Sequence, residues 1–301
     1  MTKREMIAKA IGIDPNRHFK RKFVLYVVTR MIFILVCAIS VICEDYLTAF
    51  LCAIALMVFL LPTFLYNKFS IKVPSALEIS AVLFTFMCVV GGEIGHFYAH
   101  FPLWDKFLHM FSGFLIAAIG LAFIDFSTKR KSSVLRLTPF FAVFFAFMFA
   151  LGVEVVWEFF EYLVDTLTGT TDMQADYIID YFVSKKAGGE TNPVPIIVDG
   201  IKNVTITFED GREAIVLPGY IDIGLADTMH DMIVGAAGAL LFCTIEFIAL
   251  VRRDKRMQKI PESFVPKKKE TEAELAMGEM MSDVLDEFFE KAEKFPPETK
   301  E

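Results

Sequence analysis

Acidic side chains follow one face of an apolar stretch in the second half of the chain. They are spaced by four, three and four residues within ALGVEVVWEFFEYLVD, and they are Glu154, Glu158, Glu161 and Asp165. In a helix this spacing places them on one face, over roughly 16 Å. A carboxylate in apolar surroundings can serve as a general base. Glu154 and Glu158 lie deepest in the apolar run and are therefore our catalytic candidates.

Three other apolar stretches combine histidine with acidic or hydroxyl side chains at helical spacing. The strings are GGEIGHFYAH, DKFLHMFSG and ADTMHDMIVGAAGA, and the residues are Glu93, His96 and His100; Asp105, His109 and Ser112; and Asp227, His230 and Asp231. Each set falls on one helical face or within one turn. Charged groups inside apolar helices are costly and usually face the interior of a bundle. We therefore expect the four clusters to meet.

Histidine with carboxylate, and without thiolate, suits Zn²⁺ or a similar divalent cation. Such an ion can activate water for hydrolysis. The candidate ligands are His96, His109, His230, Asp231 and Asp105, and the other members of the polar site are Glu93, His100, Ser112, Glu161, Asp165 and Asp227. The chain has no HExxH motif in these stretches, so spacing alone does not fix the ligand set.

Each cluster also has a structural interpretation. Polar side chains between membrane helices can hold the helices together. Asp105 and Asp227 open their apolar stretches and could cap helix starts, whereas Glu161 and Asp165 could be solvated at a helix end. The sequence leaves both interpretations open.

The elements that position these residues are predicted to be six transmembrane helices. The chain has 301 residues, 55% of them hydrophobic, with 32 phenylalanines, and a span needs about 20 apolar residues. Strands with open edges cannot cross lipid. The expected fold is an all-α membrane bundle with the spans Phe23–Cys43, Tyr46–Tyr66, Ala76–Tyr98, Asp105–Phe126, Thr138–Asp165 and Ala226–Val251.

Lysine and arginine predict the orientation. They gather in the leader 1–22, in the connections after the second and fourth spans, and directly after the last span. By the positive-inside rule, both termini are cytoplasmic in a plasma (inner) membrane. All four polar clusters then lie toward the outer face. The basic stretches are short and flank the spans, which argues against nucleic-acid binding.

Two polar segments complete the chain. Segment 166–225 is expected outside, and its IIVDGIKNVTITFEDGREAIVL string, with Asp199-Gly200 and Asp210-Gly211, predicts a small β-hairpin or meander. The acidic cytoplasmic tail 252–301 places apolar residues on one helical face over 271–295. This pattern indicates an amphipathic helix that binds a cytoplasmic partner or packs on the protein itself, with a frayed tail as the alternative.

A second, smaller polar set lies in the inner half of the spans. Its members are Arg30, Glu78, Asp125 and Glu246. An arginine within a span needs a partner, and the acids lie at compatible depth. Structural pairing is the expected role.

The strings DKFLHMFSG, the Glu-rich run and DTMHDMIVGAAGA resemble the family of bacterial inner-membrane proteins that includes YjdF. The resemblance covers the third to sixth spans, and it carries over to Asp105, Lys106, His109, Gly113, Glu158, Glu161, Asp227, Asp231 and Gly235. The insertion 166–225 and the acidic tail depart from the family's pattern. The DKxxH helix start is also distantly similar to VanZ-like proteins, which implies a role in the cell envelope.

Three functions are consistent with these features. The first is a metal-assisted hydrolase or transferase acting on a lipid-linked or envelope substrate at the outer leaflet of the lipid bilayer. The second is a non-catalytic membrane scaffold, whose outer hairpin and tail bind partners. The third is a proton- or ion-coupled transporter, in which the carboxylates relay ions. Whether the chain is an enzyme stays open.

Overall fold

The computed structural model describes residues 19–128, 138–169, 171–189, 194–252 and 255–268. Most of the basic leader 1–22, the basic connection 129–137 and the predicted amphipathic helix 271–295 lie outside the described residues. The described part is mostly helical. Its long helices are α2 (Phe19–Ile42), α3 (Tyr46–Phe69), α4 (Ser75–Phe86) continued by the π-helix η1 (Met87–Ile94), α6 (Trp104–Thr128), α7 (Pro139–Thr168) and α8 (Leu225–Arg252).

Five helical stretches of the described chain are long and apolar enough to cross a membrane. They are Tyr46–Phe69, Ser75–Ile94, Trp104–Asp125, Pro139–Thr168 and Leu225–Arg252. In α2 the apolar part that is described, Tyr26–Ile42, is shorter. The apolar helices confirm a membrane bundle, and the sixth span at Phe23–Cys43 stays a prediction.

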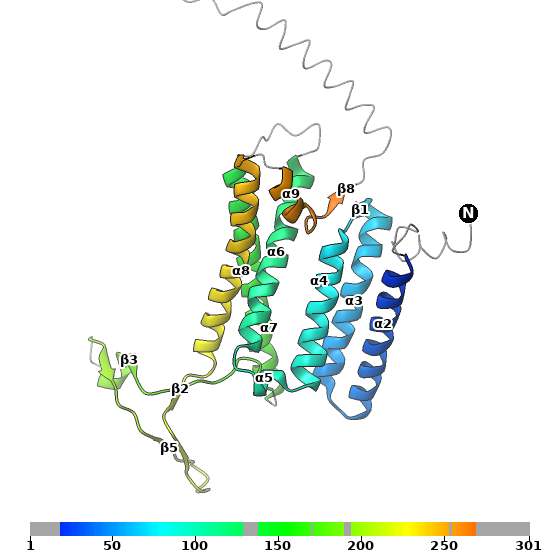
Figure 1. Ribbon diagram of the computed structural model, residues 1–301. Helices are drawn as coiled ribbons and strands as arrows, with labels where there is room; N and C mark the ends of the chain where they lie inside the picture. The colour runs from blue at the N-terminus through cyan, green and yellow to red at the C-terminus, as the bar shows by residue number, and fades with distance from the viewer. Residues whose placement is uncertain (1–18, 129–137, 170, 190–193, 253–254, 269–301) are drawn as a thin grey trace, which may run out of the picture.

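The helices pack in two adjoining groups. Helices α2, α3, α4 and η1 enclose a core that includes Phe33, Cys52 and Phe59. Helices α6, α7 and α8 enclose a second core rich in alanine. Figure 1 shows α2, α3 and α4 side by side, next to the second group.

Helices α6 and α8 approach each other backbone to backbone. A Cβ atom built on Gly113 of α6 would collide with the carbonyl oxygen of Gly235 in α8, and one on Gly238 would collide with that of Met110. The small-residue run of the last helix therefore permits close packing, as small residues do between membrane helices. This contact fixes the start of α6 against the start of α8.

The third predicted span, Ala76–Tyr98, is shorter than expected. Its helix ends at Ile94, and His96 has a left-handed backbone with φ of 53°. The short helix α5 (Phe97–His100) follows. Glycine in the middle of a helix is destabilising. The helix widens to the π form at Gly91 and Gly92, where the missing side chains make room for aromatic rings of the following segment. The regular face predicted for Glu93, His96 and His100 is therefore wrong.

The segment between α7 and α8 extends away from the helices as an arm of short antiparallel ladders (Figure 1). The ladders pair β2 (Ile178–Ile179) with β7 (Tyr220–Ile221), β3 (Phe182–Ser184) with β4 (Ile196–Val198), and β5 (Val204–Ile206) with β6 (Ile215–Leu217). The β5–β6 pair confirms a hairpin around Asp210-Gly211. Asp199-Gly200 instead separates two strands that pair with different partners. The end of the bundle that carries the arm and α5 is called the arm end below.

The opposite end of the bundle is covered by the chain that follows α8. Helix α9 (Lys255–Glu262) leads to β8 (Lys267–Lys268), which pairs with β1 (Ile71–Lys72) between α3 and α4. Between α9 and β8, Val265 is buried in the alanine-rich core, and Phe264 packs edge-on against Phe114 of α6. These two side chains close the interior of the α6–α8 group at this end.

Candidate functional site

Polar side chains of α6, α7 and α8 meet at the arm end of the bundle. Six of them are buried, namely His109, Glu154, Glu158, Glu161, Asp227 and Asp231. They come from the first turns of α6 and α8 and from the second half of α7. The stripe on α7 thus faces the interior of the bundle, as burial of charge in an apolar bundle requires.

The centre of the site is a histidine held by a carboxylate. Nδ1 of His109 lies 2.9 Å from Oε2 of Glu154, and Ser112 donates its hydroxyl to the other oxygen of Glu154 at 2.6 Å. With Glu154 ionised and the imidazole neutral, Nδ1 carries the proton and Nε2 is left with a lone pair. Nε2 lies 3.8 Å from Oδ1 of Asp105, which is too long for a hydrogen bond.

A lysine neutralises the two acids of α8. Nζ of Lys106 lies 2.5 Å from Asp227 and 2.9 Å from Asp231. It is also 3.6 Å from Asp105. Asp231 is only 1% exposed, and a buried carboxylate without a partner would be strongly destabilising. Lys106 therefore compensates the negative charge at the start of α8.

Three residues of this site could hold a metal ion. Ligand atoms of Asp105, His109 and Asp231 all lie within 4.8 Å of one another. In metal sites the second nitrogen of a ligating histidine is commonly fixed by a carboxylate, and Glu154 fixes Nδ1 of His109 in that way. One imidazole and two carboxylates suit Zn²⁺ or another divalent ion.

Two more carboxyl groups line the α7 side of the site. Glu158 is 4% exposed, and neither of its buried oxygens has a hydrogen-bond partner among the described residues. Its polar neighbours are Gln174 and Thr228, which also bond to each other at 2.5 Å. Glu161 accepts a hydrogen bond from the Trp157 indole at 2.8 Å. Within the described chain, both oxygens of Glu158 thus lack a donor in hydrogen-bonding geometry, and so does Oδ1 of Asp231, which faces Lys106 as an ion pair.

Residues 172–175, which follow α7, cover the arm end of the site and are called the roof below. The carboxylate of Asp165 accepts the backbone amides of Met173 and Gln174 at 2.9 Å. Asp227 accepts the amide of Ala175 at 2.9 Å through Oδ2, while its Oδ1 faces Lys106. Asp165 and Asp227 therefore anchor the roof, and Asp227 connects it to the site.

Some of the predicted site residues lie outside the cluster. His96 and His100 are exposed at the two ends of α5, where Nδ1 of His100 bonds to the carbonyl oxygen of His96. His230 is exposed and lies edge-on to the ring of Tyr177. Glu93 is within electrostatic range of Asp45 at the start of α3. Of the three predicted histidine ligands, the structure therefore places His109 in the cluster and the other two outside it.

The residues predicted for the inner half are spread over both groups of helices. Arg30 donates to the carbonyl oxygen of Phe59 at 2.7 Å, about one turn before Pro62 inside α3. Tyr26 stacks with Arg30 and lies near Glu78. Asp125 and Glu246 have interaction partners of their own. Pairing of Arg30 with an acid stays a prediction.

Residue types alone missed three members of the site. Lys106 was carried only by the family resemblance, and Gln174 and Thr228 were not singled out. A lysine directly after Asp105, at a depth where several acids gather, is the signal that could have identified Lys106. No local pattern marks the roof, because the carboxylate that connects it to the site, Asp227, is 52 residues away from the amide of Ala175.

Comparison with known proteins identifies a family. The model of a predicted membrane protein family, DUF2238, matches residues 24–252, well over half of the chain. The chain belongs to this family. The match is consistent with the resemblance to the YjdF-like proteins, whereas the similarity to VanZ-like proteins stays a prediction. No curated protein and no solved structure matches the chain.

Proposed function

We propose that this membrane protein binds a divalent cation through Asp105, His109 and Asp231 and uses it for hydrolysis or group transfer on a lipid-linked or envelope substrate. The observation that carries the proposal is the bond from Nδ1 of His109 to Glu154, 2.9 Å long and buried. It directs the lone pair of Nε2 toward Asp105. A histidine that only joined helices would have no need of two further ligand atoms within 4.8 Å.

The other residues have distinct parts in this chemistry. A bound cation would polarise a substrate oxygen or lower the pKa of a bound water. Glu158, whose two oxygens are free of hydrogen bonds, would accept the proton of the attacking water or hydroxyl group. Glu154 would orient His109 and would not take part in proton transfer, since both of its oxygens are engaged.

Lys106 sets a condition on cation binding. Its ammonium group lies 2.9 Å from both oxygens of Asp231. A divalent cation at Asp231 would repel the ammonium, so Lys106 must move toward Asp227 when the cation binds. The site would then keep its charge balance, because each acid of α8 retains a positive partner.

The arm end is proposed to face the outside of a plasma (inner) membrane, with both termini in the cytoplasm. The support is the distribution of lysine and arginine in the sequence. In this orientation the site lies in the outer half of the bilayer. Lipid-linked precursors of the cell envelope would reach it there.

A second function is supported by the arm. Val183 and Ile197 form a directly opposed pair across the β3–β4 ladder, and 58% and 66% of their surfaces are exposed. Exposed aliphatic pairs on two-stranded ladders are typical of surfaces that bind another chain. A membrane scaffold that binds an external partner is therefore the alternative. The transporter has less support, because Phe264 and Val265 close the other end of the α6–α8 group.

Metal analysis of the detergent-purified protein tests the proposal. The wild type should carry about one equivalent of a divalent cation after incubation and gel filtration, and His109→Ala should lose it. His100→Ala is the matched control, because His100 is exposed outside the cluster and should keep the metal. Equal metal content in His109→Ala and wild type would refute the site.

A further inference from the structure

The polar site is covered at both ends of the bundle. The roof is bonded to Asp165 and Asp227 at the arm end, and Phe264 with Val265 closes the other end. A substrate that reaches His109 without displacing either cover must approach from the side, between helices. The lipid bilayer lies on that side.

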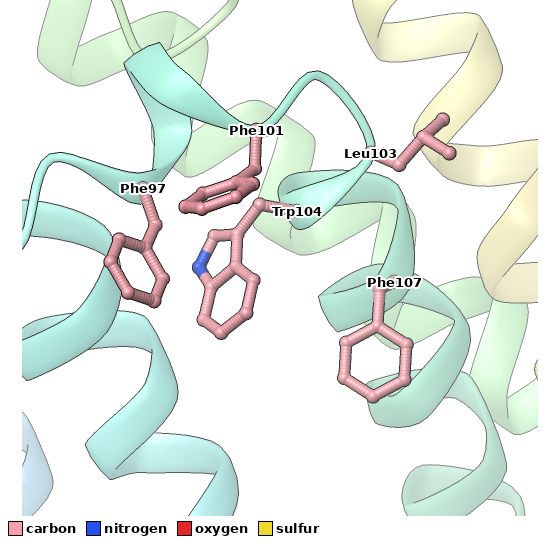
Figure 2. A pocket seen from close by; sticks show the side chains of 5 residues that line it. All are labelled: Phe97, Phe101, Leu103, Trp104 and Phe107. Atoms are coloured by element: carbon pink, nitrogen blue, oxygen red, sulfur yellow. The ribbon is translucent and has the colours of Figure 1, made fainter.

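An apolar pocket lies beside this lateral route, where α5 and the start of α6 meet. It has a volume of about 250 Å³ and is lined by Phe97, Phe101, Leu103, Trp104 and Phe107. Figure 2 shows the rings of Phe97, Phe101 and Trp104 gathered on one side of the pocket and Phe107 on the other. Small-molecule pockets usually exceed roughly 300 Å³, so this one accommodates a chain segment and not a large rigid ligand.

Trp104, which lines the pocket, has one polar atom that lacks a partner. Nε1 of Trp104 is buried and has no hydrogen-bond acceptor among the described residues. The ring is held edge-on against Phe97, with centroids 4.9 Å apart, and it packs against Gly91. Buried indole N–H groups usually find a partner. An acceptor atom supplied by a ligand, such as an ester or phosphate oxygen, would satisfy it.

The pocket and the polar site are neighbours on the surface of α6. Successive residues of a helix turn by about 100°. On this helical surface Leu103 and Phe107 lie between Trp104, in the pocket, and Lys106, in the polar site. Lys106 is 14% exposed. A molecule in the pocket can therefore extend past Leu103 and Phe107 to the ammonium group of Lys106.

We infer that the pocket binds one hydrocarbon chain of an amphiphilic substrate, whose polar head extends along α6 to Lys106 and the cation site. This inference rests on the proposed function and specifies its substrate class as a membrane lipid or lipid-linked molecule. The chain contacts the phenylalanine rings, and an oxygen near the head accepts the Trp104 N–H.

The two tryptophans of the chain provide the test. Trp157→Phe leaves Trp104 as the only indole, and Trp104→Phe leaves Trp157, which is 37% exposed on α7, as the matched reporter. Each variant of the full chain is reconstituted in phosphatidylcholine vesicles and titrated with dibromostearic acid, a single-chain amphiphile whose bromines quench indole fluorescence. As the mole fraction of dibromostearic acid in the membrane increases, quenching of Trp104 should reach a plateau. Quenching of Trp157 should instead increase in proportion to that mole fraction.

Two further variants in the Trp157→Phe background define the site. Phe107→Ser should weaken saturable quenching roughly tenfold, because a large aromatic contact is lost. Phe144→Ser, at a similarly exposed phenylalanine of α7, should leave it unchanged. Unbrominated stearic acid should reverse the quenching of Trp104. Proportional quenching of both tryptophans would mean contact with bulk lipid only and would overturn the inference.

The outcome is separable from that of the proposed function. Metal content is measured on the same preparations without the amphiphile. If His109→Ala loses the metal and quenching of Trp104 is proportional to the probe, the chain subsite is refuted and the proposed metal site stands. Saturable quenching in a protein that binds no metal would keep the chain subsite and remove the proposed chemistry.

Discussion

Nζ of Lys106 lies 2.5 Å from Oδ1 of Asp227, and Oδ2 of the same carboxylate accepts the backbone amide of Ala175. Asp227 thus connects a cation inside the bundle to the roof that covers it. Any change that moves Lys106, including binding of a metal ion at Asp231, acts on a residue that also holds the roof. The ion pair is therefore both a charge balance and a link between the site and its cover.

Lys106→Met should destabilise the protein by about 3–5 kcal/mol, because Asp227 and Asp231 are left buried without compensation. The midpoint of thermal unfolding in detergent measures this. Adding Asp227→Asn should restore part of the loss, since one of the two uncompensated charges disappears. If Lys106→Met alone were as stable as the wild type, Asp227 and Asp231 would be protonated and would need no ammonium group.

Gly113→Ala should destabilise the bundle by at least about 1–3 kcal/mol, because its Cβ would meet the carbonyl oxygen of Gly235 and neither backbone can yield freely. Gly152→Ala is the matched control in α7. A Cβ there meets no atom within 4 Å, and alanine favours the helix. Unfolding midpoints that fall equally in both variants would contradict backbone contact between α6 and α8.

The roof should respond to pH through Asp172. Partial burial, together with the carboxylates of Asp176, Asp165 and Asp227, raises the pKa of Asp172 in the folded protein. A raised pKa means that the folded state binds the proton more tightly, so this contribution to stability is present at acidic pH and is lost as pH rises through the folded pKa.

Asp172→Asn should therefore raise the unfolding midpoint slightly at pH 7 and have no effect well below pH 4, where the aspartate is protonated in both states. The comparison requires unfolding curves of wild type and variant across pH 3 to 8. A variant that is less stable than wild type at pH 7 would mean that Asp172 carries a favourable contact instead.

Much of this fold follows from the spacing of apolar residues, and the site follows from it only in part. The predicted spans at Asp105–Phe126, Thr138–Asp165 and Ala226–Val251 differ from α6, α7 and α8 by a few residues at their ends. The carboxylate stripe of α7 could be predicted because regular helical spacing extends through it. The same rule failed after Ile94, where glycines end the third helix.

Other parts of the site depend on contacts that no local pattern reveals. Asp227 and Asp231 share a face of α8, but His230 lies on a different face and contacts Tyr177 of the arm segment. Helical spacing could not show which of the adjacent residues faces α6, because that depends on the glycine contact between the two helices. The roof amides and the free oxygens of Glu158 likewise became visible only in three dimensions.

Topology is tested by reporter fusions along the chain. A fusion at Lys131 and one at the C-terminus should report the cytoplasm, and one near Asp210 in the arm should report the outside. The expectation rests on the basic residues that flank the spans. A cytoplasmic arm would move the site to the inner half of the membrane and exclude an outer-leaflet substrate.

The dependence of thermal stability on divalent cations tests the central claim most directly. Unfolding midpoints of purified wild type, His109→Ala and Asp231→Ala are measured against Zn²⁺, Mn²⁺, Mg²⁺ and Ca²⁺. A cation present at 100 times its dissociation constant should stabilise the wild type by about 2.7 kcal/mol. The shift should shrink in both variants and persist in His100→Ala. A folded wild type whose midpoint is unchanged by every one of these ions would contradict the metal site and leave a structural hydrogen-bond network in its place.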